Sequence, residues 1–180
     1  RLALPLSCRA RPSPWINPEH VVGLDSSAVI GRGAFGVVVE GEYNSQRCAI
    51  KQLPVGAPQV TRELEMLLAL RSPYIVQLLG AVYFRQRVHL VMELAPEGSL
   101  DALLCEVGYE FKMKVMADVL RGLQFLHRNG VVHRDVKPAN VLVFDRSLLA
   151  PVSAKLTDFG SCTTCDDDAG LTVGVGTIAY

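Results

Sequence analysis

The order of apolar and polar positions divides the chain into a strand-rich first half and a second half dominated by one helix. Short runs of β-branched and small apolar residues, separated by glycines and polar turns, are typical of strands. They predict strands at 28–30, 37–39, 48–50, 78–84, 88–93, 131–132, 141–143 and 154–157. Residues 43–46 predict a hairpin turn between the second and third strands.

Two segments have the period of an amphipathic helix. Residues 59–71 place Glu63, Leu67 and Leu70 on one face. A carboxylate on an apolar face needs a cation, so Glu63 rather than Glu65 is the candidate for a buried ion pair. The second helix follows from apolar residues at 111, 115, 119, 123 and 126, and a glycine at 130 ends it.

These elements predict an α+β fold in three parts. Residues 1–23 hold four prolines at irregular spacing and predict an extended leader, which Trp15 and Ile16 could dock onto the body. Residues 24–94 form a lobe with an antiparallel sheet and one helix. Residues 95–180 form a mainly helical lobe, joined to the first by a hinge near 94–98.

Composition and charge favour a globular, cytoplasmic protein. The 180 residues include 18 basic and 18 acidic side chains, and 49% are hydrophobic. Zero net charge argues against nucleic acid as a partner, and no run approaches the ~20 apolar residues of a membrane span. Five scattered cysteines fit a reducing compartment. Cys162 and Cys165 supply only half of a zinc site, so we interpret them as loop cysteines.

A glycine-rich loop lies between the first two strands. Its glycines are Gly31, Gly33 and Gly36, whose backbone can approach phosphate oxygens closely. The loop alone is equally typical of an ordinary turn, and a Rossmann loop is disfavoured because strand residues follow it. Lys51 ends the third strand, where a pair with Glu63 would aim its ammonium group at phosphates.

The most specific pattern is His-Arg-Asp-Val-Lys-Pro-Ala-Asn at 133–140, followed by Asp-Phe-Gly at 158–160. Phosphoryl transfer needs a carboxylate to accept the alcohol proton, a cation near the γ-phosphate and oxygen ligands for Mg²⁺. Asp135 can be that base and Lys137 that cation. Asn140 and Asp158 carry the hard oxygen atoms that Mg²⁺ prefers.

Taken together, these motifs resemble the eukaryotic protein kinase family from about Leu24 to Tyr180. The resemblance implies a two-lobed kinase fold, with ATP and Mg²⁺ as cofactors. It implies that the three glycines cover the ATP phosphates and that adenine lies against the hinge and nearby apolar side chains. The residues implied at the adenine site are Ile30, Val38, Ala49, Met92, Glu93, Ala95 and Leu142. It also implies an apolar spine of Leu67, Leu78, His133 and Phe159.

Two positions resemble the serine/threonine type of kinase. They are Lys137, two residues after the catalytic Asp135, and Thr177, which in such kinases bonds that aspartate and that lysine. The Lys-Pro-Ala-Asn stretch at 137–140 is similar to the Mos kinases of oocytes. The glycine loop and residues 97–100 are equally similar to the tyrosine-kinase-like group, so the subfamily stays open.

The segment between Asp158 and Thr177 is the expected activation segment. Arg134 beside the catalytic aspartate resembles kinases that are switched by a phosphate in this segment. Thr172 is the first candidate phosphosite and Thr164 the second, which would imply an upstream kinase or autophosphorylation. The acidic residues 166–168 could instead bind Arg134 and mimic the phosphate.

The expected function is ATP-dependent phosphorylation of serine or threonine hydroxyls in a protein substrate, in intracellular signalling. A pseudokinase scaffold is the alternative, and it would normally lack Lys51, Asp135 or Asp158. A small-molecule phosphotransferase is disfavoured by residues 137–138 and 176–177. The family's Ala-Pro-Glu motif is absent from the sequence. We therefore expect a C-terminally incomplete kinase lobe that is weakly stable and inactive alone.

Overall fold

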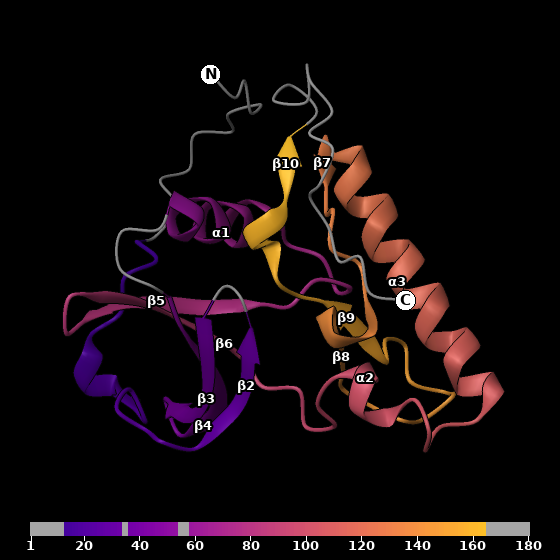
Figure 1. The fold of residues 1–180 in the computed structure, drawn as a ribbon, viewed down its shortest axis with the longest axis horizontal. Coiled ribbons are helices and arrows are strands. Elements are labelled where there is room, and N and C mark those ends of the chain that lie inside the picture. Colours follow the sequence, from indigo (N-terminus) through magenta and orange to yellow (C-terminus); the bar gives the residue numbers. More distant parts are fainter. Residues whose placement is uncertain (1–12, 34–35, 54–57, 165–180) are drawn as a thin grey trace.

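The computed structural model describes residues 13–33, 36–53 and 58–164. Figure 1 shows the first half as a curved sheet with one helix beside it, and the second half as a long helix with short strands. The sheet has six antiparallel strands in the order β1-β3-β4-β6-β5, with β2 also paired to β3. They are β1 (Val21–Val22), β2 (Val29–Gly33), β3 (Gly36–Tyr43), β4 (Gln46–Gln52), β5 (Leu78–Phe84) and β6 (Arg87–Glu93).

Tight hairpins join β3 to β4 and β5 to β6, and they set the register of these pairs. Asn44 and Ser45 join β3 to β4 with φ angles of 50° and 61°, and Tyr43 faces Gln46. The predicted turn at 43–46 is therefore confirmed. A left-handed backbone at both central residues matches the twist of the flanking strands, which is why such short loops suit hairpins.

The N-terminal segment joins the sheet before the predicted boundary at residue 23. Ile16 N donates to Ala81 O at 2.9 Å, and Ala81 N donates to Pro14 O at 2.7 Å, so this segment runs along the outer edge of β5. A 3₁₀ turn, η1 (Pro18–His20), then leads into β1. Gly80 makes the docking possible, because any side chain there would meet Ile16.

The first long helix is α1 (Pro58–Ala69), close to the predicted 59–71. Glu63, Leu67 and Leu70 are all buried, whereas Glu65 is exposed. The helix therefore presents to the core the face that its period predicts. Its single buried carboxylate among the described positions needs a cationic partner from another element.

The second half contains α3 (Tyr109–Arg128) and several short elements. Phe111, Val115 and Leu126 are buried, as the apolar period predicts. Strands β8 and β9 pair with each other, and so do β7 and β10. The short elements are α2 (Leu100–Leu103), β7 (Val131–Val132), η2 (Pro138–Asn140), β8 (Val141–Val143), β9 (Ala154–Leu156), η3 (Phe159–Ser161) and β10 (Thr163–Thr164). The short strands β7, β8 and β9 agree with the predicted strands at 131–132, 141–143 and 154–157, whereas β1, η1, α2, η2, η3 and β10 were not predicted.

One apolar cluster spans both halves of the molecule. It includes Leu67 of α1 and Leu70 just after it, together with Leu126, Leu156 and Phe159 of the second half. Ile75, just before β5, forms an isolated parallel bridge with Leu156 of β9. The two lobes therefore share a core, which fixes the cleft between them. None of the helices in the described part of the chain is long and apolar enough to cross a membrane.

Candidate active site

A cleft of about 650 Å³ lies between the sheet and the second half of the chain. Most of the residues that the sequence assigns to nucleotide binding and catalysis line it. From the first lobe and hinge these are Ile30, Gly31, Gly36, Val38, Ala49, Lys51, Met92, Glu93 and Ala95, and from the second lobe Lys137, Asn140, Leu142 and Asp158. Gly33 lies in β2 opposite Gly36. Thr177 lies outside the described residues.

Lys51 ties the two lobes together at the inner end of this cleft. Its Nζ donates to Glu63 Oε1 at 2.6 Å and to Asp158 Oδ1 at 2.9 Å. Burial disfavours the ammonium charge, but the two carboxylates outweigh it and raise the pKa of Lys51. Glu63 Oε2 is buried without a hydrogen-bond partner, so this pair depends on a single strong contact. The predicted pair of Lys51 and Glu63 is present in the structure.

The loop at residues 133–140 holds Asp135 through two neighbours. Lys137 Nζ donates to Asp135 Oδ2 at 2.7 Å. The amide of Asn140 donates to the same Oδ2 at 2.9 Å and to the backbone carbonyl of Asp135 at 2.8 Å. Asp135 is buried, and Asn140 comes to it because η2 turns the chain back within five residues. A carboxylate held in this way has a fixed direction in which to accept a proton.

Asn140 and Asp158 fit a magnesium site. The side-chain nitrogen of Asn140 makes both bonds to Asp135, which leaves the amide oxygen to accept or to ligate. Asp158 uses Oδ1 for Lys51, and both residues line the cleft. Asp158 also has a φ of 64°, a left-handed conformation that costs about 1–3 kcal/mol and is typical of functional sites. Amide and carboxylate oxygens are the ligands that Mg²⁺ prefers.

His133 and Arg134 connect the loop at 133–140 to the backbone on either side of Asp158. His133 Nε2 donates to the carbonyl of Thr157 at 3.0 Å, and the backbone N–H of Asp135 donates to His133 Nδ1 at 3.4 Å. This is a neutral imidazole, in agreement with the burial that lowers the pKa of His133. Arg134 Nε donates to Ser161 O at 2.9 Å. Of the predicted spine, the contact between His133 and Phe159 is present, with ring centroids 5.4 Å apart.

Of the two candidate phosphosites, the structure describes Thr164. Thr164 lies in β10, paired with Val131, and its side chain is buried. A buried hydroxyl cannot reach the active site of a kinase, so the second-ranked site is disfavoured. Thr172 lies outside the described residues, as do Cys165 and the acidic residues 166–168.

Several residues near the cleft were missed by the sequence analysis. Lys155 of β9 binds both carboxylate oxygens of Glu93 at 2.8 and 2.7 Å. Arg32, Glu40 and Arg47 line the cleft and add charge there. No motif could have found them, because their place at the cleft depends on how distant strands are arranged in space.

Known proteins match the chain at the level of sequence. The family described as "Protein kinase domain" matches residues 24–180. The "Probable serine/threonine-protein kinase gdt9" of Dictyostelium discoideum is 31% identical over 193 residues, covering 87% of this chain and 12% of that protein. Serine/threonine-protein kinase greatwall of Homo sapiens is 36% identical over 141 residues, covering 73% of this chain and 16% of that protein.

A third relative comes from plants. The L-type lectin-domain containing receptor kinase V.9 of Arabidopsis thaliana is 33% identical over 174 residues, covering 88% of this chain and 25% of that protein. The chain thus spans a quarter or less of the length of these three relatives. Because the matched family covers most of the chain and its motifs surround one cleft, the chain belongs to the protein kinase family, and the relatives named here are kinases.

Proposed function

We propose that the chain is the ATP-binding and catalytic part of a protein serine/threonine kinase. The observation that carries the proposal is the arrangement of Asp135, Lys137 and Asn140, with contacts of 2.7 and 2.9 Å converging on one carboxylate oxygen. Lys51, which lines the same cleft as Lys137 and Asn140, forms ion pairs with Glu63 and Asp158. A scaffold that only bound nucleotide would not need the first of these two groups.

Asp135 is the proposed acceptor of the substrate proton. The hydroxyl oxygen of serine or threonine attacks the γ-phosphorus, the bond from that phosphorus to the ADP oxygen breaks, and the hydroxyl proton moves to Asp135. Asn140 fixes the direction of the carboxylate. Lys137 places a positive charge beside the oxygens of the transferring group, where it stabilises the developing charge.

Lys51 holds the nucleotide on the opposite side of the cleft. Its ammonium group is the proposed contact of the α- and β-phosphates, and Glu63 keeps it in place. When bound, Mg²⁺ would supply Lewis-acid stabilisation of the phosphate charge, and Asn140 and Asp158 would hold it. The apolar walls from Val38, Ala49 and Leu142 are suited to a purine ring.

The preference for serine and threonine is part of this proposal. It is supported by Lys137 and by the names of two of the relatives reported above. Thr177, which lies outside the described residues, is the proposed bridge between Asp135 and Lys137. We propose a protein substrate, a cytoplasmic location and a role in signalling on the same basis.

We propose that phosphorylation of Thr172, by an upstream kinase or by autophosphorylation, controls activity. The support is Arg134, whose guanidinium already holds the start of the segment through Ser161. An added phosphate beyond it would gain charge-assisted hydrogen bonds. Phosphosite mapping of the active protein by mass spectrometry tests this idea, and active protein without phosphate at Thr172 would contradict it.

The decisive experiment measures phosphate transfer from [γ-³²P]ATP to a serine/threonine protein substrate by the full-length protein. Asp135→Asn keeps the shape of the side chain but removes the proton acceptor, so we expect at least a ~100-fold loss of transfer. MgADP affinity, measured in parallel, should change little. A folded wild-type protein that binds MgADP but transfers nothing would favour the scaffold. Equal transfer by both proteins would contradict the role of Asp135.

A further inference from the structure

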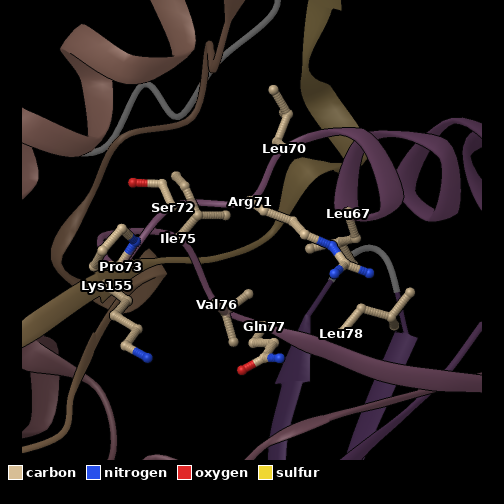
Figure 2. A pocket seen from close by; sticks show the side chains of 10 residues that line it. All are labelled: Leu67, Leu70, Arg71, Ser72, Pro73, Ile75, Val76, Gln77, Leu78 and Lys155. Carbon is tan, nitrogen blue, oxygen red and sulfur yellow. The ribbon is translucent and has the colours of Figure 1, made fainter. Parts of the chain in front are cut away.

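A second cavity, here called the rear cavity, lies behind the junction of the two lobes. It has a volume of about 340 Å³ and is lined by Leu67, residues 70–73, residues 75–78 and Lys155 (Figure 2). This volume is at the lower end of the range of small-molecule sites. Neither a catalytic residue nor a proposed Mg²⁺ ligand lines it. It is therefore a separate feature from the nucleotide cleft.

The rear cavity has an apolar wall and a cationic rim. The apolar lining includes the buried Leu67, Leu70 and Ile75, together with the exposed Pro73 and the half-buried Leu78. Figure 2 shows Arg71 extending toward Leu67, while Lys155 projects on the opposite side of the cavity. A site of this kind can desolvate an apolar ligand body and at the same time orient a charged end.

The two cations on the rim are not equivalent. Lys155 is neutralised by Glu93, which receives two bonds from its ammonium group. Arg71 is exposed, and no ion pair of its guanidinium is found among the described residues. No carboxylate belongs to the described residues that line the cavity. The rim therefore offers one uncompensated positive charge with the planar geometry that suits a carboxylate.

We propose that the rear cavity is a binding site for a small anionic amphiphile, such as an aromatic monocarboxylate. The apolar body would lie on Leu67, Leu70 and Ile75, and the carboxylate would accept hydrogen bonds from Arg71. A neutral ligand would leave the guanidinium without a counter-charge, and a cationic ligand would be repelled. A volume of about 340 Å³ suits a small molecule better than a folded partner.

The same site is connected to the nucleotide cleft, a step that rests on the proposed function. Val76 lines both cavities. Its N–H donates to Leu156 O at 2.9 Å, and Leu156 N donates to Tyr74 O at 2.9 Å, which fixes residues 71–77 to the strand before Asp158. Leu67 lies one helical turn after Glu63. We expect the ligand to bind more tightly when Lys51 is paired with Glu63 than when this pair is broken. It would then stabilise the pair, and so the affinity for MgADP should increase.

Methyl NMR of the protein with 2-naphthylacetate as the probe tests the site directly, without reliance on activity. We expect shifts of the methyl groups of Leu67, Leu70, Ile75 and Leu78. The neutral 2-naphthylacetamide is the matched probe, and we expect it to bind about fivefold more weakly, as one partly exposed ion pair allows. Arg71→Gln should remove this difference, whereas Arg87→Gln, at an exposed arginine outside the cavity, should preserve it.

Three results would overturn the site: no methyl shifts at saturating probe, shifts confined to another surface, or equal affinities for acid and amide in the wild type. The exposed Met113 and Met116 on α3 report on one such other surface. The connection to the cleft has its own readout. MgADP affinity should rise at least twofold with saturating 2-naphthylacetate, and an unchanged affinity would overturn the coupling alone. Failure of phosphate transfer would bear on the proposed function and leave the methyl shifts unaffected.

Discussion

Two lysines join the lobes of this molecule, one at the front of the junction and one at the back. Lys51 reaches from β4 to Asp158, and Lys155 reaches from β9 to Glu93. The side chain of Lys51 is 9% exposed and that of Lys155 18% exposed. Both make short contacts with carboxylates, but only Lys51 is enclosed by two separate acidic residues. Similar geometry therefore has different consequences, because burial decides how much a lost partner costs.

The largest expected effect comes from removing the front lysine. Lys51→Met would leave Glu63 and Asp158 facing each other without a cation, and would remove the proposed phosphate contact. We expect phosphate transfer to fall about 100-fold or more, in the range seen when a preorganised charge is lost. Lys155→Met is the matched variant at the back, and we expect a loss of less than about tenfold, since its removal leaves a partly hydrated glutamate. Equal losses in kcat would break the distinction between the two junctions.

A glycine tests the back junction through packing instead of charge. A Cβ at Gly122 of α3 would lie 2.9 Å from Leu156 Cδ1 and 3.2 Å from Tyr74 O, the two residues that fix β9 to the loop before β5. Gly122→Ala should therefore destabilise the fold by about 1–3 kcal/mol, the usual cost of overpacking. Gly108→Ala is the matched variant without a clash, because a Cβ there has nothing within 4 Å, and as the N-cap of α3 it should lose less than about 1 kcal/mol. Urea unfolding measures both, and equal midpoints would contradict the tight contact.

The front junction should also weaken in acid, because a neutral His133 bonds to the backbone carbonyl of Thr157, next to Asp158. Burial lowers the pKa of His133 in the folded state. The unfolded chain takes up a proton near the ordinary value while the folded chain does not, so stability is complete above that value and falls as the pH decreases. We expect His133→Phe, which keeps the ring against Phe159, to lose less stability than the wild type between about pH 7 and pH 5. Parallel curves for the two proteins in denaturant titrations would contradict this role.

The smallest expected effect concerns the reactivity of the thiols of Cys48, Cys105 and Cys162. Burial raises the pKa of Cys162 to about 12 and that of Cys48 to about 11, so both should stay protonated at neutral pH. Cys105 is exposed. We expect iodoacetamide to modify Cys105 at least ~10-fold faster than the other two, as read by peptide mass spectrometry. Urea-unfolded protein is the control, in which all three should react alike. Rapid modification of Cys162 in the folded chain would show that the front junction opens readily.

Much of the proposed chemistry was predictable because it is local in sequence. Asp135, Lys137 and Asn140 lie within six positions, and their spacing already implies one loop. The helix period also selected Glu63 over Glu65, since a face that buries leucines buries whatever else it carries. The short helices and β10 were missed, because a few residues held by tertiary contacts have no period of their own.

Buried polar contacts between distant segments were also beyond prediction. Asp118 lies on α3 with no exposed surface, and its carboxylate accepts the N–H of Ser153 at 2.8 Å, 35 positions later. The helix period predicted apolar neighbours there but not this acceptor. This hydrogen bond holds the start of β9, and no motif at Ser153 predicts it.

The sequence by itself determined the family, the two lobes and the residues available for phosphoryl transfer, because motifs and periods are properties of neighbouring positions. The tertiary structure alone decided that Lys51 binds two carboxylates, that Lys155 binds Glu93 and that Lys155 lines a second cavity. Those contacts join positions up to 107 residues apart. Their geometry follows from how α1, β9 and the sheet pack on a shared core, and packing depends on shape and burial across the whole chain.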